Sequence, residues 1–116
     1  MSELSFHDLR KANVHRNNEV FSACNNWTPM EWACSVAGEA GEICNAVKKL
    51  RRMDEGTNTA KDPQTKEQAV HAVAMEMADT IIYIDLLAAR LGINLDEAVT
   101  QKFNIVTDRM GAMVRL

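Results

Sequence analysis

Two long stretches of the sequence keep apolar side chains at the spacing of an amphipathic helix, and this pattern constrains the fold most. The first opens with the capping box Thr28-Pro29-Met30-Glu31, which places a proline at the first helical position. Its apolar residues recur every three or four positions over residues 28–52. The second stretch covers residues 65–90, and Gly92 supplies its C-terminal stop. Because the polar residues 53–64 predict a loop, we expect two long helices that pair antiparallel.

Two shorter helices complete the prediction. The string Ser5-Phe6-His7-Asp8 marks a helix start, and a loose helical spacing continues to Asn25-Asn26. A second capping box, Asn94-Leu95-Asp96-Glu97, opens a last helix that runs to about Arg109. Only five Gly and two Pro occur among 116 residues, which disfavours an all-β sandwich or barrel. We therefore expect an all-α fold, an antiparallel four-helix bundle that forms a single domain over residues 1–116.

Composition and charge exclude several classes of function. Hydrophobic residues make up 47% and charged residues 25%, as in soluble globular chains. The net charge is -3 and basic residues cluster only within residues 48–52, which argues against nucleic acid as a partner. No apolar run reaches the ~20 residues of a membrane span, and residues 1–10 lack a signal-peptide core. Cys24, Cys34 and Cys44 lack zinc spacing, so we expect reduced core thiols in a cytoplasmic protein.

Each long helix carries two acids three residues apart. Glu39 and Glu42 lie near the middle of the first helix, and Glu76 and Asp79 interrupt an apolar stretch of the second. Residues three apart share a helix face, so antiparallel pairing gathers four carboxylates. Two unit charges ~4 Å apart repel by about 4 kcal/mol at an effective dielectric of about 20, so the cluster needs a cation or protons. Oxygen ligands favour Mg²⁺, Mn²⁺ or Ca²⁺, and the simpler interpretation is a chance spacing of solvated acids.

Two further features point to a close approach by another backbone, ligand or subunit. Gly38 and Gly41 directly precede the two acids of the first pair, although each glycine costs about 1 kcal/mol relative to alanine inside a helix, so we expect a backbone or a ligand to come close there. The second long helix has apolar residues on more than one side between Met77 and Leu91, more than a single partner helix can cover. We therefore expect a homodimer or larger assembly that pairs through the two long helices.

Three other residues are candidates for the substrate site, each with a structural alternative. Trp27 precedes a helix start, where its ring either stacks on a nucleobase or packs in the core. Tyr83 lies one turn after Asp79, so its hydroxyl either reaches a ligand or is satisfied within the core. Lys49 extends the stripe that carries Glu42, which places an ammonium near phosphates or simply in solvent.

The sequence around the acids resembles a known family. The strings VAGEAGEICNAVKK and EMADTIIYIDLLAARLGINLDEAVTQKFN are similar to those of the MazG-like, all-α nucleoside triphosphate pyrophosphatases, and the match covers residues 27–109. The resemblance implies an antiparallel helical bundle that forms a homodimer or homotetramer, binds Mg²⁺ and cleaves a nucleoside triphosphate. The residues that match its metal ligands are Glu39, Glu42, Glu76 and Asp79. The residues that match its phosphate- or sugar-contacting pair are Lys102 and Asn104, and Arg109 shares a helix face with Lys102.

The expected reaction is the hydrolysis of (d)NTP to (d)NMP and pyrophosphate. The acids hold Mg²⁺ against the phosphates, while Glu39 or Glu42 orients and deprotonates a water for attack at the α-phosphorus. One alternative is hydrolysis of another phosphoanhydride, in a nucleoside diphosphate or a modified nucleotide. A second alternative, from a different functional class, is a non-catalytic helical adaptor whose acids only bind a metal. Asp85 and the loop of residues 53–64 have no role in these hypotheses.

Overall fold

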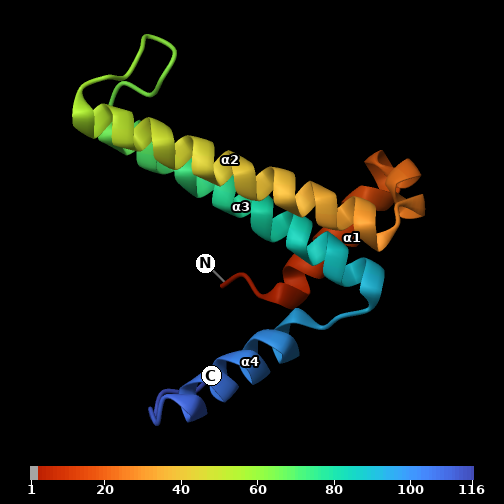
Figure 1. The fold of residues 1–116 in the computed structure, drawn as a ribbon. Coiled ribbons are helices and arrows are strands. Elements are labelled where there is room, and N and C mark those ends of the chain that lie inside the picture. The colour runs from red at the N-terminus through yellow and green to blue at the C-terminus, as the bar shows by residue number, and fades with distance from the viewer. Residues whose placement is uncertain (1–2) are drawn as a thin grey trace. The chain divides into compact units, whose positions relative to one another are not determined.

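The protein is all-α. The computed structural model describes residues 3–116, which form four α-helices and one 3₁₀ helix and contain no strand (Figure 1). The helices are α1 (Phe6–Val20), α2 (Pro29–Glu55), α3 (Lys66–Leu91) and α4 (Leu95–Arg109), and the 3₁₀ helix η1 spans Ser22–Asn26. The predicted all-α class and the four helices are confirmed. Within this described part, no helix combines the length and the apolar character that crossing a membrane would require.

Side-chain caps fix the helix starts where the sequence predicts them. The Ser5 hydroxyl accepts from the backbone N–H of Asp8 at 3.0 Å, and the Asp8 carboxylate accepts from that of Ser5 at 3.1 Å. Thr28 and Glu31 form the same reciprocal pair at the start of α2, at 2.9 and 3.3 Å. Asn94 caps α4 by accepting from the backbone N–H of Glu97 at 3.3 Å, so the capping box predicted there is only half formed among the described residues. These bonds satisfy backbone donors that lack an intrahelical partner, so the starts follow from local sequence.

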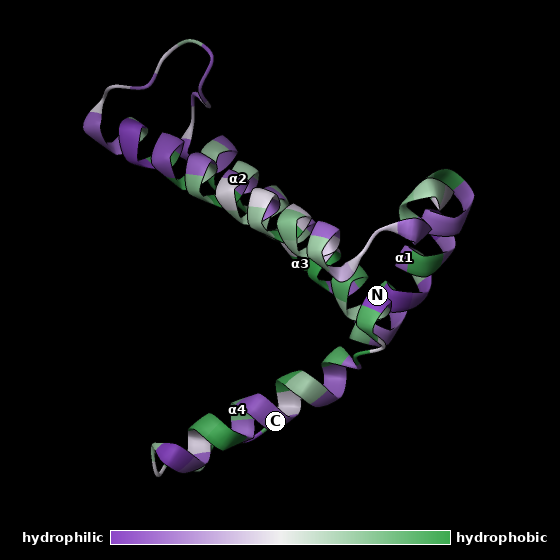
Figure 2. Cartoon of the chain, turned by 45° about the vertical axis from the view of Figure 1, so that its right-hand side comes forward, coloured by the Kyte–Doolittle hydropathy of each residue, from purple (hydrophilic) through white to green (hydrophobic). Residues whose placement is uncertain are grey.

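The described residues form two compact units, and α3 contributes to both. The hairpin unit consists of residues 28–84, and the terminal unit combines residues 3–27 with residues 85–116. In the hairpin unit, α2 and α3 lie side by side and run antiparallel, as predicted (Figures 1 and 2). At the end of the hairpin away from its loop, the buried Trp32 packs against Tyr83, with ring centroids 6.3 Å apart.

The first helix ends earlier than the sequence pattern suggested. We expected it to reach Asn25-Asn26, but α1 stops at Val20 and the chain continues as the separate 3₁₀ helix. The reason is a set of side-chain amide bonds that turn the chain back. Asn17 donates to Asn25 at 2.8 Å, and Asn25 donates to Asn18 at 2.9 Å. Short amide side chains compete in this way with a continuing helix.

The second helix ends later than expected, which shortens the loop. Residues 53–55, assigned above to the loop, belong to α2, and the helix stops at Gly56. Gly56 has φ +73°, the left-handed conformation that glycine adopts without strain. The loop between α2 and α3 therefore comprises residues 56–65.

A buried carboxylate organises this loop. Asp62 accepts from the backbone N–H of Thr59 at 2.9 Å and lies 3.5 Å from the Arg52 guanidinium. The bond from Thr59 and then the charge of Arg52 hold the pKa of Asp62 below its usual value. The Gln64 amide donates to the carbonyl oxygens of Thr59 and Asp62, at 3.0 and 2.7 Å. The loop thus has a defined, hydrogen-bonded conformation.

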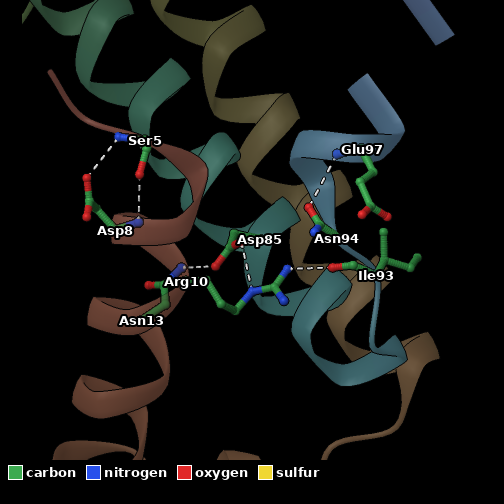
Figure 3. A network of polar contacts seen from close by, with 8 residues as sticks. All are labelled: Ser5, Asp8, Arg10, Asn13, Asp85, Ile93, Asn94 and Glu97. Atoms are coloured by element: carbon green, nitrogen blue, oxygen red, sulfur yellow. Dashed lines mark hydrogen bonds and ion pairs between the residues drawn. The ribbon is translucent and has the colours of Figure 1, made fainter. Parts of the chain in front are cut away.

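A second buried carboxylate ties the terminal unit together. Asp85 is 0% exposed and accepts from Arg10 Nε and Asn13 Nδ2, both at 3.0 Å (Figure 3). Arg10 also donates from Nη2 to the carbonyl oxygen of Ile93 at 2.9 Å. These bonds connect α1, the last turns of α3 and the segment before α4. Asp85, which had no role in the sequence analysis, is therefore a structural residue.

Two of the three thiols that were expected in the core are exposed, and so are apolar side chains of α3 that a single partner helix was not expected to cover. The three thiols are free, as predicted, but Cys34 and Cys44 are exposed, so their assignment to the core is wrong. Met77 and Ile81 of α3 are about half exposed. The physical reason is that one neighbouring helix in the hairpin covers one face of its partner, and the apolar residues on other faces stay in solvent.

Candidate metal centre

Three of the four predicted acids lie together in the hairpin unit. Carboxylate oxygens of Glu39, Glu76 and Asp79 all lie within 4.8 Å of one another. Glu39 comes from α2, and the other two come from adjacent turns of α3. Glu39 and Glu76 are half-buried, whereas Asp79 is exposed. The fourth acid, Glu42, is exposed and lies one turn beyond Glu39 on α2.

The charges of this acid cluster are not balanced by the chain itself. Among residues 3–116, none of the four acids lies within 4.0 Å of a lysine, arginine or histidine nitrogen. Partial burial, followed by the charges of Asp79, Glu76 and Glu42, raises the pKa of Glu39. A cation would relieve this repulsion. The donor set consists of carboxylate oxygens alone, which fits a hard dication such as Mg²⁺.

The glycines beside the first acid pair face open space. A Cβ atom placed on Gly38 or Gly41 would meet no heavy atom of the described chain within 4 Å. The expected close approach of a backbone is therefore wrong for contacts within the chain. An approach by a ligand stays a prediction.

A pocket of about 430 Å³ adjoins the acid cluster within the hairpin unit. Charged side chains from both helices and from the loop line it: Glu42, Glu76, Lys49, Lys61 and Asp62. The predicted substrate residue Lys49 thus shares a pocket with two of the four acids, and it is half-buried there.

The two aromatic candidates are both half-buried. Tyr83 contacts the buried ring of Trp32, which agrees with its packing interpretation. Trp27 belongs to the terminal unit, where its carbonyl oxygen accepts from Arg90 Nε at 3.0 Å. This bond uses only the backbone of Trp27, and stacking of its ring on a nucleobase stays a prediction.

The remaining candidates lie on α4 in the terminal unit. Lys102 is exposed beside an apolar groove, and Arg109 is exposed in the last turn of the helix. The Asn104 amide bonds to both backbone groups of Leu116: it accepts from the N–H at 3.0 Å and donates to the carbonyl at 3.3 Å. A nucleotide that binds the Asn104 side chain would have to replace these bonds.

Sequence reasoning missed one basic residue of the pocket, Lys61. It lies in an irregular loop, where no periodicity assigns side chains to a face. The sequence feature that could have indicated it is the position of this lysine before Asp62-Pro63, in the connection between two helices that each carry an acid pair. A lysine in that connection is a candidate for contact with any anion that binds near the acids.

No protein-family model, curated protein or solved structure matches the chain. The resemblance to the MazG-like enzymes therefore depends on the sequence strings that carry the acids. The structural observation relevant to this resemblance is that Glu39, Glu76 and Asp79 come together from two antiparallel helices.

Proposed function

We propose that the protein is a Mg²⁺-dependent nucleoside triphosphate pyrophosphohydrolase of the MazG-like type, which converts (d)NTP to (d)NMP and pyrophosphate. The observation that carries this proposal is the convergence of carboxylates from α2 and α3, with oxygens within 4.8 Å and no cationic side chain paired to them among the described residues. The resemblance of the surrounding strings supplies the substrate class.

Glu39, Glu76 and Asp79 would hold the cation, with Mn²⁺ as the alternative to Mg²⁺. One carboxylate oxygen from each of these residues already lies within 4.8 Å of the other two, so a single cation would be shared by all three. When bound, Mg²⁺ would neutralise the phosphate oxygens and the charge that develops on them.

Glu42 is our candidate general base, with Glu39 as the alternative. Glu42 is exposed, lines the pocket and is left outside the group of three that would hold the cation. Its carboxylate would orient one water molecule and take a proton from it as the oxygen attacks the α-phosphorus. The bond from this phosphorus to the bridging oxygen then breaks, and pyrophosphate leaves with the bonding electrons.

The other predicted contacts belong to the same proposal. Trp27 would stack on the base, Lys102 and Arg109 would face the phosphates, and Asn104 and Tyr83 would bind substrate hydroxyl groups. The exposed apolar side chains of α3 favour a homodimer or homotetramer, since a second subunit would cover them.

The test is a panel of dNTPs, NTPs and NDPs incubated with Mg²⁺ and scored for pyrophosphate against orthophosphate. We expect pyrophosphate from triphosphates, and we expect Asp79→Asn to abolish both turnover and Mg²⁺ binding measured by calorimetry. Asp54→Asn is the matched control, because it removes an exposed carboxylate of the same hairpin unit outside the cluster. Orthophosphate released from NDPs would favour the alternative anhydride substrate. Metal binding without any turnover would favour the adaptor.

A further inference from the structure

The pocket beside the acid cluster extends along the hairpin toward the loop. On α2 its lining runs from Glu42 to Lys49, seven residues or about 10 Å of helix. On α3 it runs from Glu76 back to Gln68, in the opposite chain direction. The pocket therefore has an acidic end next to the proposed cation and a basic end next to the loop.

The two lysines at the basic end are not paired with acids. In residues 3–116, neither Lys49 nor Lys61 lies within 4.0 Å of a carboxylate oxygen. Asp62 also lines the pocket at this end, but its carboxylate is already engaged by the backbone N–H of Thr59 and the guanidinium of Arg52. Two ammonium groups that line one pocket repel each other, and an anion between them would remove that repulsion.

Hydrogen bonds order the backbone of the loop on both sides of Lys61, whose own side chain is exposed. Besides the bonds to Asp62, the Gln68 side chain accepts from the backbone N–H groups of Gln64 and Thr65, at 3.0 and 3.3 Å. These bonds fix both sides of the segment that carries Lys61. A lysine on an ordered backbone loses less freedom when it binds an anion than one on a disordered loop. Figure 2 shows that the part of α2 nearest this loop is hydrophilic.

Small side chains keep the middle of the pocket open. Ala46 and Ala72 lie between its acidic and basic ends, one on each helix. Larger residues at these positions would fill the space between the two kinds of charge. The pocket thus joins a cation-binding end to an anion-binding end, the arrangement that a metal-chelated polyphosphate requires.

We propose that this pocket binds the β- and γ-phosphates of the nucleotide, the portion that leaves as pyrophosphate, through Lys49 and Lys61. The inference rests on the proposed function, because that function supplies the triphosphate. It further implies that inorganic pyrophosphate binds the intact protein in the presence of Mg²⁺ and competes with the substrate.

The test is calorimetric titration of the full chain with inorganic pyrophosphate and Mg²⁺. Lys49→Ala and Lys61→Ala should each weaken binding about tenfold, the loss expected for one charge-assisted contact. Lys48→Ala and Lys66→Ala are matched controls, because they remove the same charge from exposed neighbours outside the pocket, and they should change binding less than about twofold. Ala72→Met, which fills the pocket without changing charge, should also weaken binding. Circular dichroism verifies the fold of each variant.

The outcomes separate this inference from the proposed function. Parent-like binding in Lys49→Ala and Lys61→Ala, equal losses in the two controls, or no binding by the parent would overturn the pocket assignment. The proposal that the protein hydrolyses triphosphates would then still be tested separately by the nucleotide panel. If the panel shows no hydrolysis but pyrophosphate binding depends on Lys49 and Lys61, the enzyme proposal fails and the anion pocket is retained.

Discussion

Replacing Asp85 with alanine should destabilise the protein strongly. The carboxylate is fully buried and accepts from Arg10 and Asn13 at 3.0 Å each, so the substitution removes both bonds at once (Figure 3). Arg10 has a side chain 26% exposed, which lets water solvate part of its charge. Asn13 is only 3% exposed and gains little from water.

The exposed fractions of Arg10 and Asn13 determine how much free energy of unfolding the substitution should remove. Removing one partner of a buried ion pair typically costs about 3–5 kcal/mol, and partial hydration of Arg10 places Asp85→Ala near the lower limit, at about 3 kcal/mol. For a chain of this length, that loss lowers the melting temperature by roughly 10 °C. Asp85→Asn keeps one acceptor oxygen and the side-chain volume, so it should cost less than the alanine variant.

Urea denaturation followed by far-UV circular dichroism measures the change. The matched control is Asp108→Ala, which removes an ion pair with Arg115 whose side chains are 64% and 53% exposed. An exposed pair contributes less than about 1 kcal/mol. If Asp85→Ala and Asp108→Ala unfold at the same urea concentration, burial of the Asp85 network does not contribute to stability as argued.

Three further predictions concern the acids and the nucleotide. The raised pKa of Glu39 means that its stabilising contribution is present below the usual carboxyl value of 4.5 and is lost as the pH rises through the raised value. In EDTA, Glu39→Gln should therefore gain free energy of unfolding relative to the parent above that pH; a constant difference in urea titrations would contradict this. Gly38→Ala should raise the free energy of unfolding by about 0.5–1 kcal/mol, and with it the melting temperature, because the added Cβ meets no atom of the described chain. A melting temperature below that of the parent would indicate that a second subunit covers this site. In steady-state kinetics, Lys102→Ala should lower kcat/KM for all nucleotides alike, whereas Trp27→Ala should raise KM unevenly across bases. Parent-like kinetics in both variants would remove α4 and Trp27 from the proposed site.

The features that sequence predicts here are those set by residues close together in the chain. The helix start at Ser5 and the capping box at Thr28 depend on residues three positions apart, and both form as expected, whereas the box predicted at Asn94 shows only one of its two bonds. The acid pairs share a face for the same reason, since three residues are nearly one helical turn. Once a short loop makes α2 and α3 antiparallel, the meeting of Glu39 with Glu76 and Asp79 follows from the register of the hairpin.

The features that sequence does not predict depend on contacts between distant residues. Nothing in the spacing of Asp85 indicates that Arg10 and Asn13, some 70 residues earlier, supply its donors. The early end of α1 depends on amide bonds between α1 and Asn25. The exposure of Cys44 depends on how many helices surround α2, which an amphipathic pattern does not specify.

Helix α3 carries two kinds of acid: one stabilises the fold, and the other belongs to the candidate metal centre. Asp85 is buried, but a guanidinium and an amide of the chain itself match its charge and its acceptor oxygens. Asp79, in contrast, has carboxylates as its neighbours. The charges that act on Glu39 beside it come from Asp79 itself and from two other acids, Glu76 and Glu42. A carboxylate whose partners are donors of the fold has its charge matched, whereas carboxylates whose neighbours are carboxylates repel one another, and protons, water or an external cation must offset that repulsion. The acids that the chain leaves unmatched are therefore the ones for which we propose a metal ion.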